Sequence, residues 1–184
     1  MKNLSKIALA SILSIAIVIS GCSTSWIQTA ENDAPVVLQI VVSILSIADV
    51  AAIPAAQSVG AQAQSDLKLL SQYLADYKAA QAGTTEQNKA LANIQAALQA
   101  SQTDLSGILA AIHVVDPTKQ KAIEGGLAVA LSVLLAVESL IPQPAPAPAS
   151  AKAAKSAPKL LKPAEVKKTY NAVIGVAYPH AVIK

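Results

Sequence analysis

The stretch TEQNKALANIQAALQASQTDLSGILAAI, residues 85–112, decides the fold class of this 184-residue chain. Its apolar residues recur at alternating steps of three and four, which is the spacing of one face of an α-helix. These residues are Leu91, Ile94, Leu98, Leu105, Ile108 and Ile112, with Ser101 in the same register. We therefore expect one long helix, capped by Thr84 or Thr85 and running to about Val115, with a single buried face.

The flanking segments predict three more helices, each bounded by residues that start or stop a helix. Asp116 and Pro117 are typical of a cap followed by a first-turn proline, and Gly83 is a stop signal. The first of the three is apolar on nearly every side. The expected ranges are about Pro35 to Ile53 with Asp33 as the cap, about Ala55 to Ala82, and about Pro117 to Ile141.

The breaks between these helices are short, so sequential helices should lie antiparallel. Composition favours closely packed helices and argues against a β-sandwich. The chain has 38 alanines and only five aromatic residues, none of them phenylalanine. The predicted fold is all-α, an up-and-down four-helix bundle over residues 34–141.

The C-terminal part of the chain differs in composition from the bundle. Residues 142–163 are rich in Pro, Ala and Lys and have no periodic apolar face, which predicts an extended linker. Residues 164–184 form a basic amphipathic segment, with Val166, Tyr170 and Ile174 on one side. This segment predicts a short docking helix over 163–178 or, alternatively, a disordered tail.

Charge is divided along the chain. Residues 23–149 carry ten acids and five lysines, a net charge of −5, whereas residues 150–184 carry seven lysines and one acid, a net charge of +6. A basic tail of this kind suits anionic lipid head groups or an anionic cell-wall polymer. The candidate contacts are Lys152, Lys155, Lys159, Lys162, Lys167 and Lys168.

The residue types of the chain give little support to catalysis or to nucleic-acid binding. The chain lacks arginine, the residue best suited to bidentate phosphate recognition, so nucleic-acid binding is not expected. With two histidines and one cysteine, no zinc site or Cys-His nucleophile has recognisable spacing. His113 and Asp116 suggest either an acid–base pair or, as we favour, a helix-end histidine beside a capping aspartate. We expect no enzyme activity and no cofactor.

The N-terminus carries the most specific motif. Lys2 and Lys6 precede an apolar run over residues 7–19, which ends in Ile19-Ser20-Gly21-Cys22. This arrangement resembles the signal peptide and lipobox of bacterial membrane lipoproteins. The resemblance implies a signal peptide over 1–21, cleavage before Cys22, a diacylglyceryl group and usually a further acyl chain such as palmitate on that cysteine, and a tether over 22–33.

The same resemblance implies a place in the cell. The protein would be held in the cell envelope by diacylglyceryl-Cys22. Ser23, where an aspartate would signal retention, favours the periplasmic face of the outer membrane in a Gram-negative host, and the outer face of the plasma membrane otherwise.

Three functions remain open at this point. We favour a non-enzymatic structural or interaction role for a helical bundle held at the membrane surface. In an alternative, the apolar segments 34–53 and 125–142 enter the bilayer as a pore-forming or holin-like hairpin, although both are marginal as spans. A further alternative is a carrier of a lipid-like ligand. Asp49 and Glu138, the acids in these apolar segments, are expected on the solvent side of helix ends.

Overall fold

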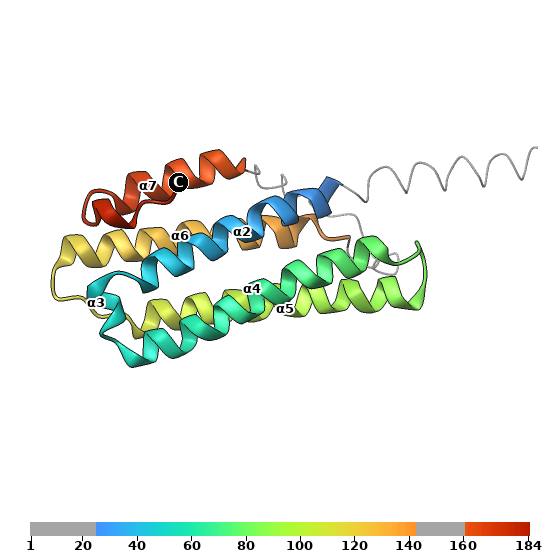
Figure 1. Ribbon diagram of the computed structural model, residues 1–184, viewed down its shortest axis with the longest axis horizontal. Helices are drawn as coiled ribbons and strands as arrows, with labels where there is room; N and C mark the ends of the chain where they lie inside the picture. The colour runs from blue at the N-terminus through green and yellow to red at the C-terminus, as the bar shows by residue number, and fades with distance from the viewer. Residues whose placement is uncertain (1–24, 143–160) are drawn as a thin grey trace, which may run out of the picture.

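The computed structural model describes residues 25–142 and 161–184, and within these ranges the chain forms six α-helices, one short 3-10 helix and no strand (Figure 1). This confirms the all-α prediction. The helices are α2 (Ser25–Leu45), α3 (Ala48–Ala51), α4 (Pro54–Ala79), α5 (Thr85–Ala111), α6 (Pro117–Leu140) and α7 (Pro163–Ile174), followed by η1 (Pro179–Ala181).

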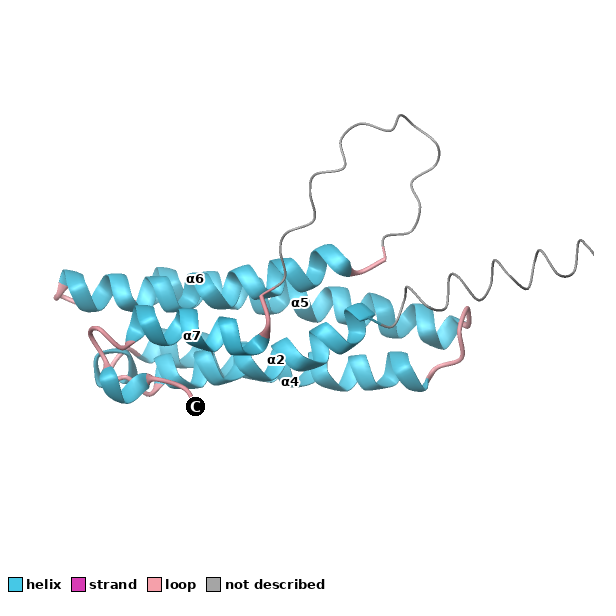
Figure 2. Cartoon of the chain, turned by 90° about the horizontal axis from the view of Figure 1, so that it is seen from above, coloured by secondary structure: helices cyan, strands magenta, loops and turns pink. Residues whose placement is uncertain are grey.

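Four long helices build an up-and-down bundle, as predicted. The hairpin of α4 and α5 lies along the pair formed by α2 and α6, and each helix runs antiparallel to the one before it (Figures 1 and 2). The predicted C-terminal helix is present as α7, which lies on the outside of the bundle against α2 and α6.

The predicted apolar face of α5 is the buried face. Ile94, Leu98, Leu105 and Ile108 are all fully buried, and they pack in one continuous core with residues from every long helix. Ser101 is buried in the same register, as the spacing predicted. The long helices are therefore held together mainly by apolar burial along their facing sides.

Helices α5 and α6 begin where the sequence predicts, because each is capped by the residue directly before it. Thr84 caps α5 by accepting a hydrogen bond from Gln87 N at 3.3 Å. Asp116 caps α6 by accepting from Thr118 N at 2.8 Å and Lys119 N at 3.2 Å. Gly83 has a φ of 79°, the left-handed conformation that favours glycine in the turn between α4 and α5.

The start of the first helix differs from the prediction. Helix α2 begins at Ser25 and runs through Asp33 and Pro35, so Asp33 is no cap and is instead buried within the helix. The cause is tertiary packing: Trp26 and Ile27 are buried, and Trp26 lies edge-on to Tyr77 of α4 with ring centroids 5.4 Å apart. Residues 25–33 therefore belong to the bundle and not to a separate tether.

The end of the first helix differs as well. Helix α2 stops at Leu45, and after a turn the short α3 follows, so residues 34–53 are not one continuous helix. Gln57 stabilises this break, because its Nε2 donates to the carbonyl oxygens of Leu45 at 3.1 Å and Val50 at 3.4 Å. These carbonyls lie at helix ends, where intrahelical partners are missing.

Candidate functional site

Two glycines in α6 allow α7 to pack closely against the bundle. A Cβ at Gly125 would lie 2.5 Å from Val173 Cγ1, and a Cβ at Gly126 would lie 3.0 Å from Tyr170 Cε2 and 3.2 Å from Ile44 Cδ1. A side chain at Gly125 would therefore force Val173 to shift, and one at Gly126 would press Tyr170 and Ile44 aside by a few tenths of an ångström. The Gly125-Gly126 pair, which lacks the spacing of a phosphate-binding loop, is therefore a notch that receives α7.

The chain after α7 folds back and is fixed by polar contacts. The hydroxyls of Ser43 and Tyr170 both donate to the carbonyl oxygen of Ala181, the latter at 3.2 Å. Asn171 pairs with both backbone groups of Ile183, at 2.9 and 2.8 Å. Lys167 Nζ donates to Lys184 O at 2.7 Å. The last residues are thus bound to α2 and α7.

Three side chains from distant parts of the chain meet where α3, α6 and the C-terminal residues converge. Asp49 Oδ2 accepts hydrogen bonds from Tyr178 Oη at 3.0 Å and from Lys119 Nζ at 3.1 Å. Lys119 Nζ also lies 5.7 Å from the centroid of the Tyr178 ring, within the range of a cation–π contact. We call Asp49, Lys119 and Tyr178 the latch.

The electrostatics of the latch follow from these contacts. The hydrogen bond from Lys119, and then the one from Tyr178, hold the pKa of Asp49 below its ordinary value. Burial, followed by the hydrogen bond to Asp49, raises the pKa of Tyr178. The latch therefore joins an ionised carboxylate to a neutral phenol at neutral pH.

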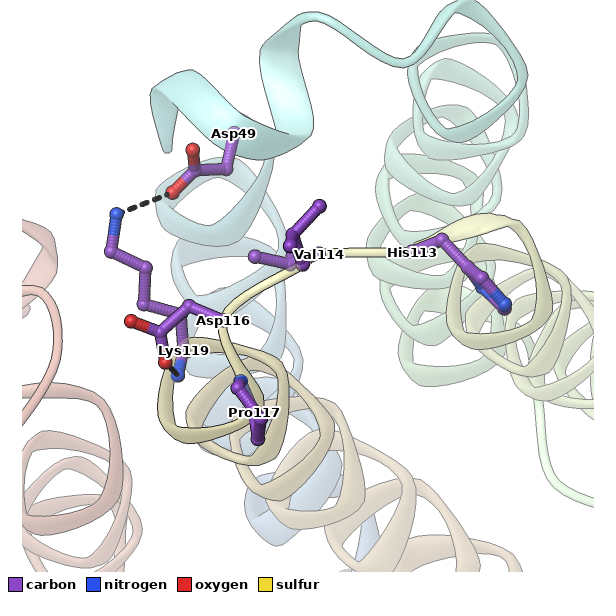
Figure 3. A pocket seen from close by; sticks show the side chains of 7 residues that line it. Asp49, His113, Val114, Asp116, Pro117 and Lys119 are labelled. Atoms are coloured by element: carbon purple, nitrogen blue, oxygen red, sulfur yellow. Dashed lines mark hydrogen bonds and ion pairs between the residues drawn. The ribbon is translucent and has the colours of Figure 1, made fainter.

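A pocket of about 530 Å³ opens beside the latch at this end of the bundle. It is lined by Asp49, His113, Val114, Val115, Asp116, Pro117 and Lys119, which come from α3, the α5–α6 loop and the start of α6 (Figure 3). Its lining combines both charge signs with apolar loop residues.

The α5–α6 loop that borders the pocket is fixed by Gln120. Gln120 Oε1 accepts from Val114 N at 2.9 Å, and its Nε2 donates to Ile112 O at 3.3 Å and to Glu124 Oε1 at 2.7 Å. Next to these bonded residues, the Val115 side chain is fully exposed. Gln120 thus fixes the loop and leaves Val115 exposed at the pocket.

His113 and Asp116 make separate contacts, as the capping interpretation predicts. Asp116 Oδ1 accepts the two backbone hydrogen bonds that cap α6. His113 Nδ1 lies 3.0 Å from Ile112 O, and the ring points away from Asp116 (Figure 3). The alternative acid–base pair is therefore not assembled in this structure.

The predicted lysine contacts fall partly within the described residues. Lys162 stands at the cap of α7 and, like Lys168, is exposed, whereas Lys167 is engaged with Lys184 O. The other candidates, Lys152, Lys155 and Lys159, lie outside the described residues. The lipobox residues Ile19, Ser20, Gly21 and Cys22 also lie outside them.

The two acids of the apolar segments have different surroundings. Asp49 is exposed at the end of the bundle, as expected. Glu138 is half-buried instead, because it faces α5, where Gln102 Nε2 donates to Glu138 Oε2 at 2.8 Å.

Sequence reasoning missed the surroundings of two further acids, Asp33, which is buried, and Asp104, which is half-buried. Asp33 is 2% exposed, its Oδ1 has no partner among the described groups, and burial raises its pKa to about 6. Burial, and then the neighbouring carboxyl of Asp66, raises the pKa of Asp104. Since neither position breaks the helical pattern, periodicity alone signals nothing about these groups.

The described residues hold no group of three or more His, Cys, Asp or Glu side chains that could bind a metal ion. Comparison of the chain with protein-family models, with curated proteins and with solved structures finds no match. The features that bear on function are therefore the motif at the N-terminus, the geometry of the bundle and the latch.

Proposed function

We propose that this protein is an envelope lipoprotein, anchored through diacylglyceryl-Cys22, whose helical bundle has a non-enzymatic interaction role at the membrane surface. The observation that carries the proposal is the position of α2: it begins at Ser25, only three residues after the lipobox cysteine. Three residues span at most about 11 Å. The bundle would therefore stand directly on the membrane.

This anchoring gives the bundle a direction. The end where α2 begins would face the membrane, and the end with α3, the latch and the pocket would face away from it (Figure 1). A helix of 27 residues, the length of α5, spans about 40 Å. Val115 and the pocket would thus be presented about 40 Å from the anchor, where a protein partner or wall component is accessible.

The same orientation of the bundle would bring the basic segment close to anionic lipid. Helix α6 ends at the end of the bundle where α2 begins, so the chain that carries Lys152, Lys155 and Lys159 leaves from the proposed membrane side (Figure 2). Lysines near an anionic surface each contribute about 1 kcal/mol of attraction. An anionic wall polymer is the other partner that this charge suits.

Fractionation of cells that express the full chain tests the anchor. We expect the wild-type protein in the membrane fraction after high-salt washing, labelled by a fatty-acid analogue such as alkyne-palmitate. Cys22→Ser should lose the label and keep residues 1–21, because cleavage in lipoproteins follows acylation. Thr24→Ser, a conservative change two residues away, is the matched control. A cleaved, unlabelled wild-type protein would contradict the proposal.

One observation favours the alternative of a membrane-active protein. Among the described helices, α6 is the one long and apolar enough to cross a membrane by length and composition. Its buried side, however, packs against α2, α5 and α7. Residues 23–184 made without the lipid distinguish the two functions: a bundle that leaves dye-loaded vesicles intact supports the surface role, and leakage supports insertion.

A further inference from the structure

The first nine residues of α2, which we call the lead segment (25–33), are attached to the bundle mainly by apolar contacts. Trp26 and Ile27 are buried, whereas the ion pair of Glu31 with Lys78 of α4 lies at the surface, where such pairs contribute little. Trp26 Nε1 is buried as well, but it has no hydrogen-bond partner among the described groups. A buried donor without a partner costs free energy, which weakens the attachment.

Asp33, the last residue of the lead segment, places a carboxyl group in the apolar seam of α2. Ala30, Asp33, Val37 and Ile40 follow one another at steps of three and four residues, and each is at most 2% exposed. Asp33 Oδ1 has no hydrogen-bond partner among the described groups. A neutral carboxyl group fits such a position, whereas a carboxylate would be buried there without compensation.

The helices packed against α2 offer Asp33 no opposite charge within the described part of the chain. Lys78 of α4 is engaged with Glu31 at 2.9 Å, and Glu138 of α6 is itself an acid that accepts from Gln102 at 2.8 Å. The titratable groups on the adjoining turns of α2, α4 and α6 and on the contacting face of α7 are Glu31, Asp66, Tyr73, Tyr77, Lys78, Glu138 and Tyr170. Burial, and none of these groups, raises the pKa of Asp33 to about 6.

Pro35 gives α2 a second place to begin. Because proline has no N–H, the carbonyl of Glu31 loses its partner within the helix, and the proline ring crowds that carbonyl. An aspartate shortly before a proline starts a helix elsewhere in this chain, at Asp116 and Pro117. With the lead segment detached, Asp33 would cap the remaining helix by accepting from the backbone N–H three residues on. A carboxylate is favoured at that position by the helix dipole.

We propose that α2 has two starting points, Ser25 and Ala34, and that the proton on Asp33 selects between them. In the long form the neutral carboxyl group is buried in the seam. In the short form the carboxylate caps the helix in water and the lead segment is detached. The short form loses the burial of Trp26 and Ile27 and gains hydration of the carboxylate and conformational freedom for nine residues. The seam beyond Pro35 stays buried and keeps the rest of α2 in place.

The proton favours the long form. The pKa of Asp33 is about 6 when the side chain is buried, against an ordinary value of 3.8, so the long form binds the proton more tightly. Detachment of the lead segment therefore becomes easier as pH rises through about 6. Between pH 4.5 and pH 7.5 the equilibrium constant for detachment should rise about 25-fold.

Detachment would lengthen the tether of the bundle, a consequence that rests on the proposed anchor at Cys22. The long form begins three residues after Cys22, and the short form begins twelve residues after it. Twelve residues span at most about 40 Å. The proton on Asp33 would thus control the reach of the bundle: close to the membrane in acid, and with a growing share of longer tethers towards neutral pH.

Hydrogen exchange in the full chain, extracted in a non-ionic detergent, tests the two starting points. The amides of residues 29–34 bond within the first turns of α2 in the long form and are free in the short form. At pH 7.5 we expect these amides to be less protected than those of α5, which open only with the bundle. Corrected for the intrinsic rate, their exchange should be about 25-fold faster at pH 7.5 than at pH 4.5.

Asp33→Asn is the matched variant, because asparagine has the shape of the neutral side chain and does not titrate. Its corrected exchange at residues 29–34 should be the same at both pH values. Residues 29–34 as strongly protected as α5 at pH 7.5, or a pH response that persists in Asp33→Asn, would overturn the proposal.

Pro35→Ala tests the second start without a change at Asp33. Alanine restores the missing hydrogen bond to Glu31 O and removes the crowding, so protection of residues 29–34 should rise at both pH values. Unchanged or lower protection would contradict a starting point at Ala34. Exchange at these residues does not read the state of Cys22, so failure of this proposal leaves the proposed lipid anchor untouched.

Discussion

Tyr178 donates a hydrogen bond to Asp49, 129 residues earlier in the chain, and the two oxygens are 3.0 Å apart. Since Tyr178 is almost fully buried, the bond ties the C-terminal residues to the short helix α3. The same carboxylate oxygen accepts from Lys119 at the start of α6. One oxygen atom thus joins three segments that share no local sequence.

Removal of the Tyr178 hydroxyl should loosen the C-terminal segment, residues 161–184. We expect Tyr178→Phe to reduce the free energy of unfolding by about 1 kcal/mol, the typical net value of a hydrogen bond, and to speed hydrogen exchange in α7 more than in α5. Tyr73→Phe, on the half-buried side of α4, is the matched control. Equal exchange rates for α7 in Tyr178→Phe and in the wild type would show that the latch contributes nothing.

The latch should also weaken in acid. The pKa of Asp49 is held below its ordinary value of 3.8, so its contribution is present above that pH and is lost as pH falls through the lowered pKa. Asp49→Asn should remove this acid dependence of α7 exchange. If the variant and the wild type lose protection of α7 at the same pH, a group other than Asp49 controls the acid dependence of α7 docking.

Asp33 should give the opposite pH dependence. Its pKa is about 6 in the folded protein against an ordinary 3.8, so the folded state binds the proton more tightly. The free energy of unfolding should therefore fall by about 2 kcal/mol between pH 4.5 and pH 7.5, which is most of the roughly 3 kcal/mol that the whole shift from 3.8 to about 6 represents. Urea denaturation of residues 23–184 at pH 4.5 and 7.5 measures this difference.

Two substitutions separate charge from burial at this position. Asp33→Asn removes the titrating group and should remove most of the decline with pH, and Asp33→Leu should in addition stabilise the protein at pH 7.5. Asp76→Asn, on the exposed face of α4, is the control for a general effect of charge. A decline with pH that persists in both Asp33 variants would contradict the assignment.

The glycine notch predicts a size-swap pair. Gly125→Ala should destabilise the docking of α7 by about 1–3 kcal/mol, because the new methyl group meets the stiff, β-branched Val173, although alanine is the better helix former by about 1 kcal/mol. Gly125→Ala/Val173→Ala should recover most of this loss in a thermal melt. A double variant less stable than both single variants would show that the two positions do not meet.

Much of the bundle is predictable from the sequence because its determinants are local. The threonine cap at Thr84, the cap and proline at Asp116 and Pro117, and the positive-φ turn at Gly83 each act within a few residues. The spacing of Leu98, Leu105 and their neighbours likewise reports a buried face directly.

The start of α2 is not predictable in this way. Asp33 and Pro35 form the same kind of cap-and-proline signal as Asp116 and Pro117, yet the helix continues through them because Trp26 and Ile27 are buried against the bundle. Pro35 is exposed, but it lacks the N–H that would bond within the helix and its ring crowds the carbonyl of the preceding turn. Tertiary burial outweighs this local cost.

The latch and the pocket depend on contacts between distant segments. No periodicity or motif relates Asp49 to Tyr178 or Val115 to the latch, so a single sequence holds no signal for them. The amphipathic pattern of residues 163–178 predicts that α7 docks, but the choice of α2 and α6 as its partners follows from the glycine notch.

The intact mass of the protein extracted from its native membranes tests the central claim most directly. The account predicts a chain that begins at Cys22, carries a diacylglyceryl group with or without an additional N-terminal acyl chain, and shows no reaction with a thiol reagent. A mass equal to the unmodified chain, whether it begins at Met1 or after an ordinary signal peptide, together with a reactive thiol at Cys22, would contradict it.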